Sequence, residues 1–314
     1  TLKSVKTAHQ LLAKPCDVSV LCEALQKTSV LHQILADDAI RRVVARIDTL
    51  PSMPANCADI MDELQSEDAS IQRVANLIAQ DLGMTAKILQ MVNSAFFGLF
   101  RRVADVQDAV MLLGLDAIKA LVLSINVFSA FNTRRIPFFD IEGLWQHSLV
   151  TGGYARQIMT LIARDRNQAT AAFLSGMLHD IGKLILAINF RDAYRSLIRE
   201  TATSAIDRLA REREAIGTTH AEVGAYLMGL WGLESPILTA IAFHHAPLES
   251  PIQTIAPLTA VHLANGFEHR RRQSPNGGCP AAEEFDRSYM DRLSLAAHIE
   301  DWRQACADLE EGRS

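Results

Sequence analysis

Cysteine is scarce, and the five cysteines of the chain are scattered without a Cys-x-x-Cys pair. This spacing argues against a disulfide framework and against a zinc site built on thiolates, and it is typical of reduced thiols in a cytosolic protein. The sequence also contains neither a glycine-rich phosphate loop of the Gly-x-x-x-x-Gly-Lys type nor a serine nucleophile motif. Those two routes to nucleotide binding and to hydrolysis are therefore not expected.

An excess of positive charge is missing as well. The formal charge of −5 at pH 7 provides no overall basic field for nucleic acid. A short basic run, Arg270–Arg272, is predicted to lie in an exposed polar loop that continues to Pro280. The predicted helices on either side of Gly114 imitate a helix-turn-helix, but the second is too apolar to read a DNA groove. Direct DNA binding is therefore not expected.

Neither a membrane span nor a secretory signal is recognisable. The longest apolar region, Val110–Phe131, is interrupted by Asp116 and Lys119, which predicts a buried helix. Residues 1–30 do not have the charged start, apolar run and cleavage site of a signal peptide. With 49% apolar and 21% charged residues, the composition indicates a globular protein. We expect a cytoplasmic location and no membrane association.

Helical periodicity dominates the sequence from Asp37 onward. No run of alternating apolar and polar residues competes with it after residue 40, so the predicted fold class is all-α. Ser70 and Thr85 are expected to cap helices, and Gly83 and Gly114 to mark breaks between helices. The predicted helices are 38–47, 55–65, 70–80, 85–93, 105–112, 116–131, 140–163, 168–188, 191–201, 204–216, 218–230, 236–244, 254–270 and one or two within 288–309.

The first 36 residues follow another pattern. A short predicted strand begins at His9 and stops at Lys14-Pro15, and Asp17 caps a helix that follows. This order resembles the last portion of a two-component receiver domain, whereas the alternative is a plain strand-to-helix turn. The resemblance implies that residues 1–36 are the end of a receiver and its connector. The lack of a tandem repeat or a long linker predicts that residues 37–314 form one compact unit with two helical lobes. The receiver resemblance also implies that a cognate sensor kinase acts through the full receiver.

An apolar stretch over residues 173–186 carries His179 and Asp180 side by side. Ionisable groups in a core need partners, and a metal ion suits imidazole plus carboxylate. Lys183 is expected on the same helical face as His179. The other candidate ligands are His147, His220, His244, His245 and Asn265, the last of which shares a face with His262. Imidazole and carboxylate donors suit Fe, Mn or Zn, although a single such histidine is more often a hydrogen-bonded core residue.

Ordered motifs then suggest a family. Trp-x-His-Ser at 145–148, His-Asp-Ile-Gly-Lys at 179–183, His-Ala-Glu-Val-Gly-Ala at 220–225 and His-His at 244–245 resemble the HD superfamily of metal-dependent phosphohydrolases. Leu-Pro-x-x-Pro at 50–54, Asp-Leu-Gly-Met at 81–84, Asn-Ser-Ala at 93–95 and Leu-Gly-Leu at 113–115 resemble its HDOD subgroup. That resemblance implies a helical output domain of bacterial signalling proteins.

The resemblance also implies roles for single positions. His147, His179 and Asp180 match the first ligands of catalytic HD enzymes. The matches to the HD-GYP branch, which hydrolyses cyclic di-GMP, are His220, His244 and His245 as extra ligands and Lys183 near a phosphate. Two departures weaken a catalytic interpretation: Asn265, a neutral amide, stands where the final Asp is expected, and no Gly-Tyr-Pro segment follows His245.

Three functions stay open at this stage. The leading hypothesis is a signalling output module that acts through conformational change and protein partners. The second is a metal-dependent phosphohydrolase acting on a nucleotide, with Lys183 steadying a phosphate. The third is a sensor that binds a nucleotide or a metal without turnover. The same side chains can also satisfy one another as a buried polar network. We expect signalling rather than catalysis.

Overall fold

The computed structural model describes residues 43, 47, 55–66, 68–97, 102–129, 131, 135–199, 205–231, 233–273 and 285–310. Within these ranges the chain consists of helices and connecting turns, without a strand, which confirms the all-α prediction. The predicted receiver piece, with Lys14 and Pro15, lies outside the described residues. So does most of the predicted connector helix 38–47.

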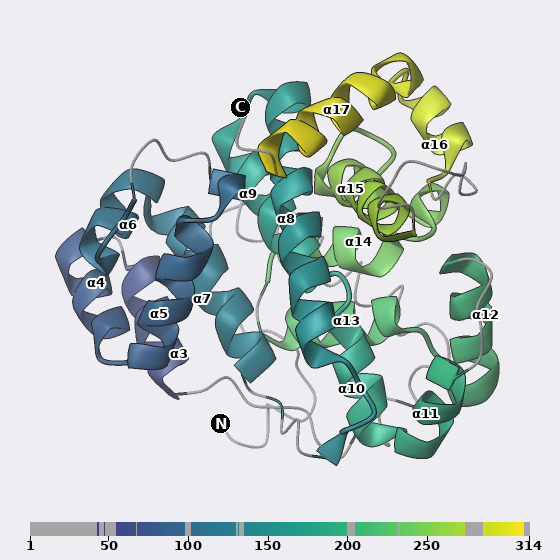
Figure 1. The fold of residues 1–314 in the computed structure, drawn as a ribbon, viewed down its shortest axis with the longest axis horizontal. Helices are drawn as coiled ribbons and strands as arrows, with labels where there is room; N and C mark the ends of the chain where they lie inside the picture. The colour runs from purple at the N-terminus through teal and green to yellow at the C-terminus, as the bar shows by residue number, and fades with distance from the viewer. Residues whose placement is uncertain are drawn as a thin grey trace, which may run out of the picture.

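The helices form two groups around a long central helix. They are α3 (Ala55–Gln65), α4 (Ile71–Ala79), α5 (Leu82–Val92), α6 (Val106–Leu113), α7 (Leu115–Ser129), α8 (Ile141–Ala163), α9 (Arg166–Leu178), α10 (Gly182–Asn189), α11 (Arg191–Arg199), α12 (Ala205–Ile216), α13 (His220–Leu230), α14 (Ser235–Phe243), α15 (Pro257–Gln273), α16 (Arg287–Arg292) and α17 (Ile299–Glu310). Figure 1 places α3–α7 on one side of α8, and α10–α17 on the other. This arrangement agrees with the two predicted lobes.

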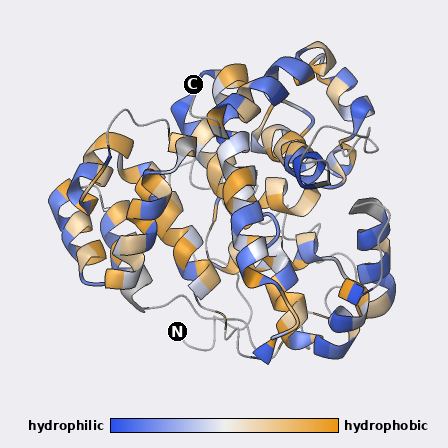
Figure 2. Cartoon of the chain, viewed as in Figure 1, coloured by the Kyte–Doolittle hydropathy of each residue, from blue (hydrophilic) through white to orange (hydrophobic). Residues whose placement is uncertain are grey.

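Two hydrophobic clusters hold these helices together. The larger one joins α3–α7 to α9, α10, α13 and α14, and α7 contributes fully buried residues such as Ile118 and Leu121. The smaller one packs α15, α16 and α17 against α8 through residues such as Tyr154, Tyr289 and Trp302. Figure 2 shows α7 as largely hydrophobic and the outlying α12 as largely hydrophilic. Burial of apolar surface therefore explains why α7 packs against α9 as well as against the other helices of its own group.

The predicted single helix over 168–188 is wrong, and the difference affects the site. The structure breaks it into α9 and α10, with a turn at His179, Asp180 and Ile181. At the start of α10, a Cβ atom on Gly182 would lie only 1.8 Å from the carbonyl oxygen of His220. Glycine lets α10 approach the start of α13 this closely. The stretch 166–189 is long and apolar enough to cross a membrane, but 89% of its apolar window is buried inside the protein.

Two of the four predicted helix ends are confirmed. Ser70 caps α4, and Gly114 ends α6 with a φ of 83°. Thr85 as a cap and Gly83 as a break were wrong, because Asp81 caps α5 by accepting a bond from Met84 N at 3.0 Å. The other described helix ends differ from the predicted ones by a few residues at most.

The basic run at the end of α15 was also misplaced. Arg270, Arg271 and Arg272 lie in the last turn of the helix and not in a loop. Arg272 pairs with Glu268 one turn earlier and donates to the carbonyl oxygen of Gly143 on α8 at 3.1 Å. These contacts extend the helix through the basic residues, and a sequence pattern alone does not reveal them.

Candidate metal centre

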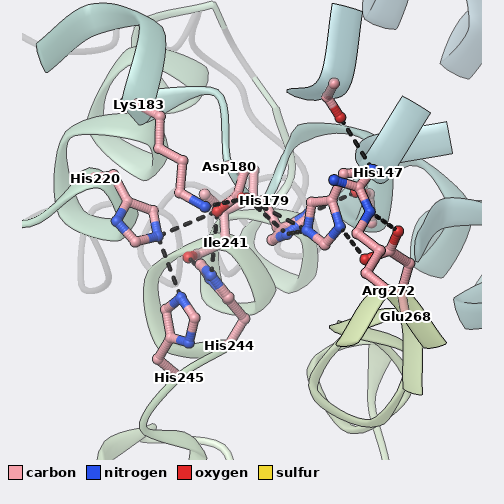
Figure 3. A network of polar contacts seen from close by, with 12 residues as sticks. His147, His179, Asp180, Lys183, His220, Ile241, His244, His245, Glu268 and Arg272 are labelled. Carbon is pink, nitrogen blue, oxygen red and sulfur yellow. Dashed lines mark hydrogen bonds and ion pairs between the residues drawn. The ribbon is translucent and has the colours of Figure 1, made fainter. Parts of the chain in front are cut away.

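Five helix ends or faces bring the candidate ligands together, as Figure 3 shows. His147 comes from the second turn of α8, and His179 with Asp180 forms the turn between α9 and α10. His220 is the first residue of α13, whose start is held by a capping box between Thr219 and Glu222. The remaining pair directly follows α14: these are His244 and His245. All six predicted imidazole and carboxylate ligands are thus assembled in one place.

The first donor set is a triangle of ligand atoms. His147 Nε2 lies 3.1 Å from His179 Nε2 and 3.4 Å from Asp180 Oδ2. His179 Nε2 lies 3.3 Å from the same carboxylate oxygen. Two atoms that are each about 2.1 Å from one ion lie about 3.0 to 3.4 Å apart at octahedral or tetrahedral angles. The three separations therefore match those of ligands on a single ion.

The second donor set uses the other oxygen of the same carboxylate. His220 Nε2 lies 3.2 Å from Asp180 Oδ1 and 3.2 Å from His245 Nε2. His244 Nε2 lies 3.8 Å from Asp180 Oδ1. In Figure 3, Asp180 lies between His220 and His245 on one side and His147 on the other. Asp180 is therefore placed to bridge two sets, with one oxygen for each.

Hydrogen bonds at Nδ1 orient four of the rings. The acceptors are Glu268 Oε2 for His147 at 2.6 Å, Gly176 O for His179 at 2.7 Å, Glu212 Oε2 for His220 at 2.7 Å and Ile241 O for His244 at 2.8 Å. A proton on Nδ1 leaves the lone pair of a neutral ring on Nε2, which in each case faces Asp180. Two such lone pairs at 3.1 Å repel, so a proton or a metal ion must lie between them.

A buried nitrogen atom, His244 Nε2, favours a metal ion over a proton. Asp180 Oδ1 and His244 Nε2 make no hydrogen bond in the described structure. A buried polar atom without a partner costs about 1 to 3 kcal/mol, and a proton on His220 Nε2, 3.2 Å from Asp180 Oδ1, would satisfy that oxygen but would leave His244 Nε2 without a partner. A divalent cation in the second set would contact both. The residues present therefore fit a divalent metal centre.

The pKa values divide the rings of each donor set into raised and lowered ones. Burial alone raises the pKa of Asp180, but the charges of His179 and Lys183 hold it well below its ordinary value. Burial alone lowers the pKa values of His147 and His220, yet both are raised overall, because each ring contacts Asp180 and a glutamate. Burial, together with nearby imidazoles, depresses the pKa values of the remaining rings, which are His179, His244 and His245.

Lys183 directs its charge into the pocket that holds His179 and Asp180. Sequence spacing puts it on a helical face with His179, and in the structure its ammonium group pairs with Asp180 Oδ2. Only 9% of Lys183 is exposed, so this contact is largely shielded from water. The lysine therefore neutralises the oxygen that belongs to the first donor set. It competes with any cation for that oxygen.

Asn265, a predicted ligand, and His262 are both buried on α15. The Oδ1 atom of Asn265 makes no hydrogen bond to any residue that the structure describes. His262 donates to the carbonyl oxygen of His244 at 2.7 Å and accepts from the Asp286 amide at 2.7 Å. It therefore braces the turn that carries His244 and His245.

Sequence reasoning missed three groups that border the centre. Glu268 and Glu212 accept hydrogen bonds from His147 and His220, and the His269 ring lies 4.9 Å from the His147 ring. Glu268 had a usable signal, since it lies three residues after Asn265 on one predicted helix. Glu212 had none: it differs from the exposed Glu214 only by its orientation on α12.

A family model for the HDOD domain matches residues 50–247 of the chain. The chain belongs to the HDOD family. An uncharacterised protein of Treponema pallidum is 27% identical over 71% of this HDOD chain and 43% of its own length. The chain spans less than half of the length of the curated relatives that it matches.

Two solved structures share the HDOD chain's fold. A Shewanella amazonensis protein, provisionally named a phosphohydrolase, has a TM-score of 0.64 and 20% identity, covering 87% of this chain and 98% of that one. A Marinobacter aquaeolei protein, provisionally named a signal transduction protein, has a TM-score of 0.61 and 19% identity, covering 92% of this chain and 64% of that one. At these identities the likeness concerns the fold alone.

Proposed function

We propose that this chain is a signalling module whose HDOD core binds divalent metal at the His-Asp centre without turning over a substrate. The observation that carries the proposal is the convergence of Nε2 atoms on the two oxygens of Asp180, at separations that suit shared ions. Imidazole and carboxylate donors without thiolate favour Fe, Mn or Zn. The metal would tie α8, α13 and α14 to the turn between α9 and α10, so its occupancy would alter how these helices pack.

Burial supports binding over turnover. His179, His220 and His244 are fully buried, Asp180 is 1% exposed, and only His245 among the predicted histidine ligands is partly exposed. A bound divalent ion supplies charge that polarises a phosphoryl oxygen and acidifies water, but a phosphoester must reach it. Lys183, the group expected to hold a phosphate, is already paired with Asp180. These features support a site that holds cations and leaves little access for a nucleotide.

Hydrolysis is the second candidate function. Its support is the shared carboxylate, because two donor sets joined by Asp180 resemble a site for two ions that act on one phosphoryl group. In that case Lys183 would leave Asp180 and contact a substrate phosphate. A sensor that binds a nucleotide without turnover uses the same groups.

The proposed signalling role involves both predicted domains of the chain. Residues 1–36 are taken as the end of a receiver domain, and residues 37–314 as the HDOD domain, which extends beyond the family match through α15–α17. A cognate sensor kinase would act through the complete receiver, and protein partners would read the state of the HDOD domain. The location proposed is cytoplasmic, without membrane or direct DNA contact. The signalling name of the Marinobacter aquaeolei relative supports this role.

Metal analysis combined with turnover assays tests the proposal. The protein is purified without chelators, and Fe, Mn and Zn are measured by mass spectrometry in the wild type and in His179→Ala. We expect bound metal in the wild type and less bound metal in the variant, because only the first donor set loses a ligand. The same samples are incubated with a panel of nucleotides and cyclic dinucleotides under Mn²⁺ or Fe²⁺.

The two measurements separate the candidates. Bound metal without hydrolysis supports the proposed function. Hydrolysis by the wild type that is lost in His179→Ala supports the phosphohydrolase instead. Wild-type protein that holds no metal after dialysis against Mn²⁺, Fe²⁺ and Zn²⁺ overturns both. The cluster would then be a buried polar network.

A further inference from the structure

Two buried glutamates border the centre without belonging to either donor set. Glu212 on α12 is 1% exposed, and Glu268 on α15 is fully buried. They approach the cluster from helices that are far apart in the sequence, and they lie behind different histidines. A buried carboxylate is costly unless it is paired, so the contacts of these two side chains should explain their position.

Both glutamates orient a metal-facing ring from behind. Glu268 Oε2 accepts a hydrogen bond from His147 Nδ1 at 2.6 Å. Glu212 Oε2 accepts bonds from both the backbone N–H and the Nδ1 of His220, at 2.8 Å and 2.7 Å. His179 and His244 instead donate to backbone carbonyls. Each donor set therefore contains one histidine that is held by a carboxylate.

The negative charge of the two glutamates would help the centre to hold cations. The two donor sets share a single carboxylate, Asp180, and their remaining ligand atoms are imidazole nitrogens, which bring no negative charge. Two divalent cations would bring four positive charges, of which Asp180 offsets one. A glutamate hydrogen-bonded to Nδ1 makes the ring a better donor and adds negative charge next to the ion. Among the described residues, Glu212 and Glu268 are the carboxylates that contact ligand rings in this way.

The environments of the two carboxylates differ. Arg272 and Arg271 contact the second oxygen of Glu268, and they neutralise part of its charge. The second oxygen of Glu212 faces the buried hydroxyl of Tyr194 at 3.5 Å. A hydroxyl does not cancel the charge. Glu212 should therefore have the stronger influence on its neighbouring ring.

We propose that Glu268 and Glu212 are positioning residues, each serving one donor set. Glu268 sets the affinity of His147, His179 and Asp180 for an ion, and Glu212 sets the affinity of Asp180, His220, His244 and His245. The inference rests on the proposed function, because it presupposes that the centre binds metal. It goes beyond that function by giving the two halves of the centre separate controls.

Cobalt binding tests the assignment without using any activity. Chelator-stripped protein is titrated with Co²⁺, whose visible absorption reports on its coordination, and affinity is measured by competition with a chelator. His179→Ala removes one ligand from the first set, and His244→Ala removes one from the second. In each background, the intact set therefore provides the tighter Co²⁺ site. In the His179→Ala background, we expect Glu212→Gln to lower the Co²⁺ affinity of the second set by about 10- to 100-fold. Glu268→Gln should leave that affinity unchanged. In the His244→Ala background, we expect the reverse.

Glu214→Gln is the matched control. Glu214 lies on the same helix as Glu212 and undergoes the same loss of charge, but it is exposed. Its substitution should leave both Co²⁺ affinities at the wild-type value in either background. An effect as large as that of Glu212→Gln would mean that general electrostatics, and not positioning, determines the affinity.

The outcomes separate this inference from the proposed function. Wild-type protein that takes up no Co²⁺ contradicts the proposed function and, with it, the inference. Wild-type protein that binds Co²⁺, while Glu212→Gln and Glu268→Gln bind it equally well in both backgrounds, contradicts the inference alone. If a Gln variant unfolds after stripping, Glu212→Asp or Glu268→Asp keeps the charge but shortens the reach. The same selective weakening is then expected, and its absence overturns the inference.

Discussion

At the scale of single residues, histidines of one centre differ in what lies behind them. His147 and His220 face glutamates, and their pKa values are raised even though burial lowers them. His244 faces a backbone carbonyl and other imidazoles, and its pKa lies well below the ordinary value. A ring that stays neutral keeps a lone pair for a cation. The environment, and not the residue type, therefore decides which rings are ready to bind.

The pair of Asp180 and Lys183 permits a prediction at this scale. In chelator-treated protein, Asp180→Asn should lower the free energy of unfolding by roughly 3 kcal/mol, because the largely buried ammonium group of Lys183 loses its counter-charge. Adding Lys183→Met to this variant should recover more than half of the loss. Urea unfolding followed by circular dichroism measures both. The double variant should still bind no metal in its first set.

An exposed pair serves as the control for that experiment. Glu300 and Arg303 form an ion pair on α17 in which the glutamate side chain is 72% exposed. Glu300→Gln should change the free energy of unfolding by less than about 1 kcal/mol. An Asp180→Asn protein that is no less stable than Glu300→Gln would show that the buried pair contributes nothing to folding.

At the scale of secondary-structure elements, the site depends on how α10 meets α13. Gly182 begins α10 beside the carbonyl oxygen of His220, and a Cβ there would also lie 2.9 Å from the amide nitrogen of Gly224. Both neighbours are backbone atoms and cannot rotate away. The turn that carries His179 and Asp180 therefore depends on a close approach of two helices.

Gly182→Ala tests this approach. The added methyl group should separate α10 from α13 and lower the free energy of unfolding by at least about 2 kcal/mol, as overpacked cores do. It should also weaken metal binding, because His220 moves relative to Asp180. Urea unfolding and Co²⁺ titration are the two measurements.

Gly83→Ala provides a contrasting substitution on α5. That glycine is exposed, and the nearest atom to an added Cβ is Asp81 Oδ1, a side-chain atom, at 3.3 Å. Alanine is favoured over glycine in a helix by up to about 1 kcal/mol, so the variant should be at least as stable as the wild type. Equal destabilisation by both substitutions would contradict the role given to Gly182.

At the scale of the whole molecule, the buried rings make stability depend on pH. Burial and the charge of His147 lower the pKa of His269 from 6.5 to about 3, and those of the buried rings His179, His244 and His245 are lowered too. Below pH 6.5 the histidines of the unfolded chain bind protons, whereas these rings in the folded protein stay neutral. The free energy of unfolding therefore decreases as the pH is lowered. The raised rings, His147 and His220, stabilise the fold below pH 6.5 and lose this contribution only as the pH rises.

Chelator-treated protein should therefore lose stability between pH 6.5 and pH 4.5, by at least about 1 kcal/mol per pH unit. Below pH 4.5 the loss should steepen, since contacts with His147 and Arg272 hold the pKa of Glu268 at about 2 against an ordinary 4.5. Urea midpoints at a series of pH values measure the slope. His269→Gln should make it shallower between pH 6.5 and pH 4.5. A midpoint that does not vary with pH would contradict the buried neutral rings.

Much of the molecule was predictable from the order of its residues. The spacing of apolar residues in segments such as 105–112 and 140–163 determined the all-α class, because a helix buries a stripe with a period of 3.6 residues. The donor types were also predictable, since His147, His179, Asp180 and the later histidines occur in an order that resembles the HD superfamily. Side-chain chemistry and local periodicity are properties of the sequence itself.

Only the tertiary structure decided how those residues are arranged around the centre. The break after Leu178, the assignment of one Asp180 oxygen to each donor set, and the placing of Glu212 and Glu268 behind two rings all depend on contacts between distant segments. His147 and Glu268 are 121 positions apart, yet they lie 2.6 Å from each other. Local periodicity predicts which face of a helix is buried, but distances between buried side chains are set only when the helices pack.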